Sequence, residues 1–465
     1  MDLSFIAKRL ALLVVACVAV SQAAPIAVAQ SGSEGASDIV SPDEMRVAAV
    51  NALQSGHSRA ALTMANALLL RDALDVPALI IKSRAARNVG EFNAAIAAGK
   101  SAWVQANTED EKYAAAMAVA QALSSDGKRT MAQFWLRRAA DKAPNEATRN
   151  IAARDFRYVR ARNPWSSELS FNIAPSNNIN NGSVHETTKL FGLPFDFELN
   201  GAARALEGLE YSAGYAGRYR FDQTELYAQD VIFQVNHRTY SLSDSARAMA
   251  PGVKGRDFAF SQLGAGYVYQ RTPKNWVGPF TLNATGGHTW YGGDPYSTYL
   301  RLGASQKIDL GPSNVVNFSG SVERQYGSAA PDADILRADL RFAHGFGKIG
   351  TLGLSLGHSD SMSDDTSANF TELRGGVEFY LGKPVFGAQV SFGIDWRHRD
   401  FPNSRYDPSG RNDTEVSASL DMTFTQIERY GFNPTISLNT SRTDSNIGLF
   451  DSESLGVSFG LRSAF

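Results

Sequence analysis

The hydrophobic residues of this chain follow two different spacings along its 465 residues. From 42 to 162, apolar side chains recur every three or four positions, as in Leu62 and Ala65, which places them on one face of a helix. Further on, apolar and polar residues alternate, as they do from Val416 to Phe424, and this is the period of a half-buried β-strand. The pattern predicts an α-helical domain at 42–162 and an all-β domain at 166–465.

The helical part contains a weak internal repeat. Gly56, Gly90 and Gly127 recur at intervals of 34 and 37 residues, and a similar alanine-rich segment follows each glycine. A glycine in the first helical turn and a proline closing the second helix, here Pro144, resemble a tetratricopeptide repeat array. Such arrays present a concave groove that usually binds a peptide or a protein. A plain helical bundle is the alternative interpretation of the same pattern.

The length of the alternating segments favours a transmembrane barrel over a soluble sandwich. They run for about ten residues or more, whereas strands of globular sheets usually have about five or six. Long polar connections such as 175–203 and 400–412 alternate with tight ones such as Gly382-Lys383-Pro384, as in outer-membrane barrels. We therefore predict an α + transmembrane β fold, in which a tetratricopeptide-like domain precedes a closed 14-stranded antiparallel barrel. The predicted strands are 167–174, 204–220, 224–240, 257–271, 279–290, 297–309, 315–326, 333–345, 350–358, 370–381, 385–399, 413–428, 432–442 and 454–465.

Both ends of the chain carry export features. Lys8 and Arg9 precede an apolar segment, and Ala27-Val28-Ala29 fits a cleavage site, so we predict a signal peptide at 1–29. Lipidation at Cys17 is the less favoured alternative, because this cysteine lies inside the apolar segment. The last strand, with Phe459, Leu461 and the terminal Phe465 on one face, resembles the signal read by the outer-membrane barrel-assembly machinery.

Composition excludes several classes of protein. The 45 basic and 47 acidic residues give no electrostatic case for a nucleic-acid partner. A mean hydropathy of −0.23 argues against a polytopic helical membrane protein.

The predicted barrel and the export features place the chain in the outer membrane, in contact with its lipids. We expect the helical domain to lie in the periplasm and the barrel to be monomeric.

Charged residues that alternate with the apolar positions are expected to point into the barrel. Both signs are present, so this lumen could hold water or a solute, or its charges could simply pair with one another. The candidate lumen-lining residues are Glu210, Asp230, Arg301, Arg337, Asp339, Arg341, Arg374, Glu378, Asp395, Arg397, Asp421 and Arg462.

A search for catalytic chemistry finds one weak motif. Ser355 lies in a Gly-x-Ser-x-Gly pattern, with His344 and His358 nearby, but an alternating strand is the wrong context for a nucleophile elbow. The seven histidines show no spacing typical of a zinc site. We predict no catalytic residues, no metal, no cofactor and no enzymatic activity.

Two motifs resemble the surface lipoprotein assembly modifier family. They are Ala174-Pro175-Ser176-Asn177-Asn178-Ile179-Asn180-Asn181, which opens the barrel, and Gly431-Phe432-Asn433-Pro434-Thr435 with Ser441-Arg442-Thr443-Asp444-Ser445-Asn446 near its end. The resemblance implies an outer-membrane translocator that helps deliver particular lipoproteins, or related secreted proteins, to the cell surface. It implies cooperation with the barrel-assembly machinery and no covalent chemistry.

The residues leave other functions open. A porin or a polysaccharide export channel also fits a barrel joined to helical repeats. The pattern does not identify the client or solute. It does not distinguish passage through the lumen from passage along the seam between the first and last strands, and the loop 175–203 could act as a plug.

Overall fold

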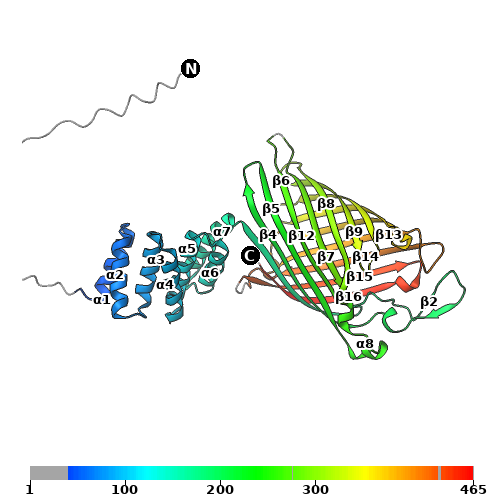
Figure 1. Ribbon diagram of the computed structural model, residues 1–465, viewed down its shortest axis with the longest axis horizontal. Helices are drawn as coiled ribbons and strands as arrows, with labels where there is room; N and C mark the ends of the chain where they lie inside the picture. The colour runs from blue at the N-terminus through cyan, green and yellow to red at the C-terminus, as the bar shows by residue number, and fades with distance from the viewer. Residues whose placement is uncertain (1–39, 275, 428–430, 464–465) are drawn as a thin grey trace, which may run out of the picture.

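The computed structural model describes residues 40–274, 276–427 and 431–463 (Figure 1). The predicted signal peptide, Cys17 and Phe465 lie outside these ranges. Helices come first in the described chain, and a barrel follows them. The first helices are α1 (Pro42–Gln54), α2 (Ser58–Arg71), α3 (Val76–Asn88), α4 (Phe92–Gln105), α5 (Glu109–Ser125), α6 (Arg129–Asp141) and α7 (Glu146–Arg162).

The three repeated glycines explain how the helices are paired. Gly56, Gly90 and Gly127 have φ angles of 81°, 87° and 76°, a left-handed conformation that costs a glycine little. Each lies in the turn between two helices, α1 and α2, α3 and α4, or α5 and α6. The prediction that the glycine occupies the first turn of a helix was therefore wrong, because the left-handed geometry is needed to reverse the chain.

Side-chain caps begin the first helix of each pair. The side chains of Ser41, Asp75 and Thr108 accept hydrogen bonds from the backbone at the starts of α1, α3 and α5, and Asn145 does so for α7. These caps satisfy backbone N–H groups that have no partner within the helix. Within the described residues, no helix is long and apolar enough to cross a bilayer.

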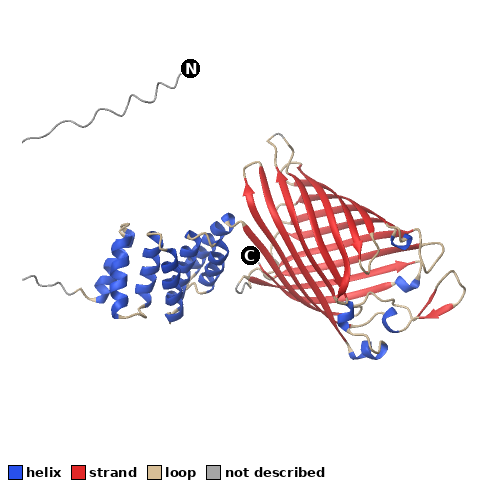
Figure 2. Ribbon diagram, viewed as in Figure 1, coloured by secondary structure: helices blue, strands red, loops and turns tan. Residues whose placement is uncertain are grey.

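The strands form a closed antiparallel barrel (Figure 2). It has fourteen strands, and β1 lies between β4 and β16. This confirms the predicted fold class. The two other strands, β2 (Thr187–Lys189) and β3 (Asp196–Glu198), form a hairpin in the loop after β1. The barrel strands are β1 (Trp165–Ser176), β4 (Gly208–Gln223), β5 (Tyr227–Leu242), β6 (Phe260–Arg271), β7 (Phe280–Tyr291), β8 (Asp294–Asp309), β9 (Asn314–Gly327), β10 (Ala333–Gly345), β11 (Gly350–Met362), β12 (Phe370–Leu381), β13 (Gln389–Phe401), β14 (Arg411–Thr423), β15 (Phe432–Ser445) and β16 (Ser452–Ser463).

Each predicted strand overlaps an observed one, but some boundaries were wrong. The segment 385–388 is a turn before β13, with Phe386 at a φ of 49°. The alternating pattern continues into this turn, so it does not mark where β13 begins. The connection between β7 and β8 is only Gly292-Gly293, although it lies at the end of the barrel where most connections are long.

The two faces of the barrel wall differ in polarity. Large apolar side chains such as Leu300, Leu302, Phe459 and Leu461 are exposed on the outer face, where lipid is their natural solvent. Within the described residues, every barrel strand is paired with a neighbour on both sides, so the strands satisfy most of one another's backbone hydrogen bonds within the membrane. The architecture is that of an outer-membrane barrel protein.

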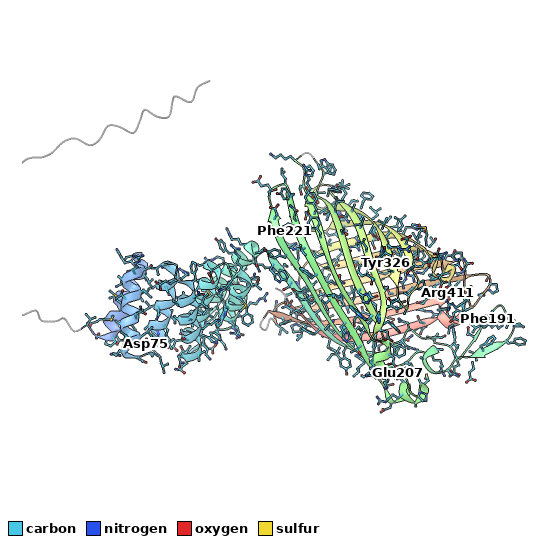
Figure 3. The ribbon with its side chains drawn as sticks, in the orientation of Figure 1. Asp75, Phe191, Glu207, Phe221, Tyr326 and Arg411 are labelled. Carbon is cyan, nitrogen blue, oxygen red and sulfur yellow. The ribbon has the colours of Figure 1, made fainter. Side chains whose placement is uncertain are left out.

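The helices join the barrel at one of its two ends. Only Asn163 and Pro164 separate α7 from β1. The Asn163 side-chain amide donates to Thr130 Oγ1 at 3.0 Å, and the Pro164 carbonyl accepts a bond from the backbone of Arg220 at 2.8 Å. Figure 3 shows Phe221 toward this end of the barrel and Phe191 and Arg411 at the far end. Most of the long loops, which carry α8 (Asp244–Met249), lie at the far end.

Candidate functional site

The strand registers place all the predicted lumen residues on the inner face of the barrel. They share this face with the small polar residues Ser170, Ser437 and Ser458, which line a common hollow with Glu210, Asp421 and Arg462. The predicted residues then fall into two groups. One group forms ion pairs, and its members are Asp230, Arg301, Arg337, Asp339, Arg374, Arg397 and Arg462. The other group lines hollows and forms no ion pair among the described residues, and its members are Glu210, Arg341, Glu378, Asp395 and Asp421.

A buried glutamate organises the largest cluster of charges. Glu372 on β12 is 5% exposed, and its carboxylate accepts bonds from Arg374 at 2.9 Å and Arg399 Nε at 3.0 Å. Arg397 Nε lies 3.9 Å from the same carboxylate. Arg374 in turn donates to Asp339 at 2.7 Å. Three arginines are therefore held side by side on the inner wall by one central acidic group.

A second buried glutamate holds two more predicted arginines. Glu323 on β9 receives Arg301 from β8, and Arg337 from β10 at 3.1 Å. Sequence reasoning missed Glu323, Glu372 and Arg399. Glu372 carried a usable signal, because it lies two positions before Arg374 on the same alternating face.

A third set of charges lies nearer the helices. Arg220 on β4 binds Asp230 on β5 through two bonds of 2.7 and 2.9 Å. Arg462 on the last strand approaches Glu168 on the first at 3.2 Å. These pairs connect neighbouring strands within the barrel wall.

The barrel interior contains hollows as well as paired charges. One of about 470 Å³ lies along β9 to β14 and is lined by Arg341, Glu378 and Asp395. Another of about 630 Å³ lies along β13 to β16, β1 and β4. The lumen is therefore partly filled by ion pairs and partly open to water-sized molecules.

A third hollow connects the barrel with the helical domain. It measures about 560 Å³, and its lining includes Arg160 from α7 together with Glu168, Arg218, Gln262 and Arg301 from the barrel. The last turns of α7 therefore stand at the rim of the lumen.

The long loop after β1, residues 177–207, packs on other loops at the far end. Ser183 Oγ donates to the Gly448 carbonyl at 2.6 Å, and His185 contacts Asp451 at 2.7 Å. The ring of Phe191 lies 6.3 Å from that of Tyr406. In Figure 2 the β2–β3 hairpin of this loop projects beyond the barrel strands.

The weak catalytic motif is divided between the two faces of the wall. Ser355 lines the inner hollow, whereas His358 shares the outer parity of Leu354 and Leu356 on β11. His344 has the outer parity on β10. This arrangement does not bring the serine and the histidines together, and the absence of enzymatic activity stays a prediction.

Two arginines of α3, Arg84 and Arg87, lie on one face of the helical domain. Arg87 on α3 donates to Gln121 on α5 at 2.8 Å, and Tyr113 on α5 donates to the Thr148 carbonyl of α7 at 3.2 Å. Arg84 is exposed beside Tyr113, and its side chain forms no hydrogen bond or ion pair among the described residues.

Both arginines keep some access to solvent, but nearby protein atoms remove part of their hydration. Loss of hydration lowers the pKa of the Arg84 and Arg87 guanidinium groups below its ordinary value, and repulsion from Arg84 adds to the effect at Arg87. We call Arg84, Arg87, Tyr113 and Gln121 the arginine face. Its positive charge suits an anionic ligand.

Comparisons with known proteins give structural likenesses only. No protein-family model and no curated protein matches the chain. The Yersinia enterocolitica type III secretion translocator chaperone SycD aligns at 18% identity and a TM-score of 0.24, over 26% of this chain and 88% of its own. OccAB3 of Acinetobacter baumannii aligns at 8% identity and a TM-score of 0.36, over 64% of this chain and 98% of its own. OmpT of Vibrio cholerae, in a loop-deletion form, aligns at 9% identity and a TM-score of 0.33, over 65% and 99%.

Proposed function

We propose that this chain is an outer-membrane translocator that helps deliver specific lipoproteins or related secreted proteins to the cell surface. The helical domain engages the client in the periplasm, and the barrel provides the passage through the membrane. The resemblance of Ala174–Asn181 and Gly431–Thr435 to the surface lipoprotein assembly modifier family supports this proposal. The barrel-assembly machinery is the expected partner, and neither a cofactor nor a covalent step is required.

One observation carries the proposal. The hollow that begins beside Arg160 of α7 continues along barrel residues as far as Gln262 and Arg301. A segment held by the helices would therefore lie directly at an opening of the lumen. A helical domain that served only as a spacer would not need to line this opening.

Deleting the gene tests the function directly. Intact cells are shaved with protease, and the released peptides are identified by mass spectrometry. We expect specific lipoproteins to disappear from the shaved fraction while remaining in the whole-cell lysate. An unchanged surface proteome, with reduced solute uptake or reduced surface polymer, would overturn the proposal.

The arginine face predicts a charge requirement for client delivery. Replacing Arg84 and Arg87 together by glutamate should reduce the shaved lipoprotein signal about fivefold to tenfold, since exposed ion pairs contribute about 0.2–1 kcal/mol each and reversal adds repulsion. The matched control is the same double substitution at Arg59 and Arg71, which are exposed on α2. Equal losses in both variants would show that net charge, not this face, matters.

A channel for solutes or polysaccharide is the second candidate. The inner wall at β15, β16 and β1 carries hydroxyl and amide groups such as Asn172, Ser437, Asn439 and Ser458, and such groups suit a neutral polar polymer. Conductance in a planar bilayer separates the two functions. Large and stable ion-selective channels would favour the solute channel over the translocator.

A further inference from the structure

The first and last strands are joined by an interrupted ladder. Register partners between β1 and β16 are consecutive only from Ser170–Arg462 to Ile173–Phe459, and they resume at Ser176–Gly456. The gap falls at Ala174 and Pro175, and a proline has no N–H to donate. By contrast, β1 pairs with β4 without a break along its whole length.

Side chains take over where the backbone ladder stops. At the far end, Asn177 Oδ1 accepts a bond from the Leu455 backbone N–H at 2.8 Å. Asn178 Nδ2 donates to the Glu453 carbonyl at 3.2 Å and to the Gly182 carbonyl at 2.9 Å. Toward the helices, the Leu169 N–H donates to the Ser463 hydroxyl at 2.7 Å. This seam is therefore closed at both described ends by side-chain bonds. These bonds can break while the backbone ladder between them stays paired.

The seam has a hollow on each of its faces. Inside, Ser170, Asn172 and Gly456 line the polar hollow of about 630 Å³. Outside, on the lipid face, a depression of about 530 Å³ crosses the same strands. Its apolar lining includes Phe171, Ile173, Tyr211, Phe459 and Leu461. A polar space and an apolar space are thus separated by a short backbone ladder.

We infer that the β1–β16 seam is a lateral exit, through which an acyl-bearing segment of the cargo moves from the lumen into the membrane. The polar hollow accepts the polypeptide, and the outer depression accepts an acyl chain. Acyl chains avoid a charged lumen because burying apolar surface in an apolar environment is favourable. This inference rests on the proposed function and names the route that the cargo takes.

A reversible disulfide across the seam tests the route. Ile173 and Phe459 are register partners, and antiparallel partners lie at Cα distances of about 4.5–5.5 Å, which a disulfide accepts. In a deletion strain complemented with I173C/F459C, oxidation should abolish the shaved lipoprotein signal, and a membrane-permeant reductant should restore it. The probe is the set of lipoproteins that the gene deletion removes from the surface.

The matched control locks the same residue to its other neighbour. Ile173 also pairs with Tyr211 on β4, so I173C/Y211C introduces one disulfide in the same layer of the same strand. This variant should deliver lipoproteins equally well when oxidised and reduced. Full delivery by the oxidised seam variant would overturn the lateral exit while leaving the translocator function standing. If the deletion itself changes no surface lipoprotein, the proposed function fails first.

A second pair keeps the test valid if the first variant does not assemble. Phe171 pairs with Leu461 across the seam and with Ala213 on β4. F171C/L461C and F171C/A213C therefore repeat the comparison two residues along the strand. Hydrogen exchange of the wild-type protein adds an independent measurement. The Leu455 amide, whose N–H is bonded to Asn177 across the seam, should exchange faster than the amides of β15, and equal protection would contradict an opening seam.

Discussion

Replacing Glu372 by alanine is expected to destabilise the barrel by about 2–3 kcal/mol. The substitution removes the carboxylate that the guanidinium groups of Arg374, Arg397 and Arg399 share. Breaking a fully buried ion pair costs about 3–5 kcal/mol, and the arginines here are partly hydrated, so a smaller loss is expected. The midpoint of heat-induced unfolding, followed by gel mobility in detergent, should fall by roughly 5 °C or more.

Glu378 on the same strand provides the control. It also faces the lumen, but its carboxylate accepts a bond only from the Tyr380 hydroxyl at 2.9 Å among the described residues. Glu378→Ala should change the midpoint little. Removing one of the crowded arginines as well, in E372A/R399A, should recover part of the loss, because repulsion falls. A single E372A variant as stable as wild type would show that lumen water screens the three charges.

The barrel is largely predictable from the sequence because each strand carries its own alternation. Leu336, Ala338 and Leu340 face lipid while Arg337 and Asp339 face the lumen, and the predicted segment 333–345 coincides with β10. A membrane imposes this pattern on every strand, since outer positions must be apolar. Strand number and the closed fold follow from the same local signal.

The pairing of lumen charges is not predictable in this way. Asp339 and Arg374 are 35 positions apart in sequence, and they meet only because β10, β11 and β12 lie in one particular register. Alternation indicates which face a residue occupies but not how strands slide past one another. The sequence therefore could not decide whether the lumen charges pair with one another or leave the lumen open. The structure contains both arrangements.

The asparagines that follow β1 show a similar limit to prediction from sequence. Asn177 and Asn178 could be noticed as part of a resemblance, but their partners at Leu455 and Glu453 lie more than 270 positions away. Only ring closure brings the first and last strands together. A role in holding this seam shut was therefore not visible in the sequence.

In the helical domain, replacing Trp135 by alanine should have the largest effect. Trp135 on α6 is 5% exposed, its ring meets Trp103 edge to face at 5.5 Å, and Arg138 lies over it at 4.8 Å. The surrounding core is rich in alanine, with Ala116 and Ala120 fully or almost fully buried. Small neighbours cannot move far enough to fill the space, so we expect a loss of about 3–5 kcal/mol.

The loss at Trp135 should be confined to the helices. Urea unfolding followed by circular dichroism at a helix-sensitive wavelength should show an earlier helical transition, while the heat-induced gel shift of the barrel stays unchanged. Met131→Ala on the same helix is the control, because Met131 is 47% exposed. If the helical transition and the gel shift of the barrel both move to milder conditions, the helices and the barrel unfold as one cooperative unit. In that case the short Asn163-Pro164 connection transmits stability as well as position, and the helical domain holds the rim of the lumen in place.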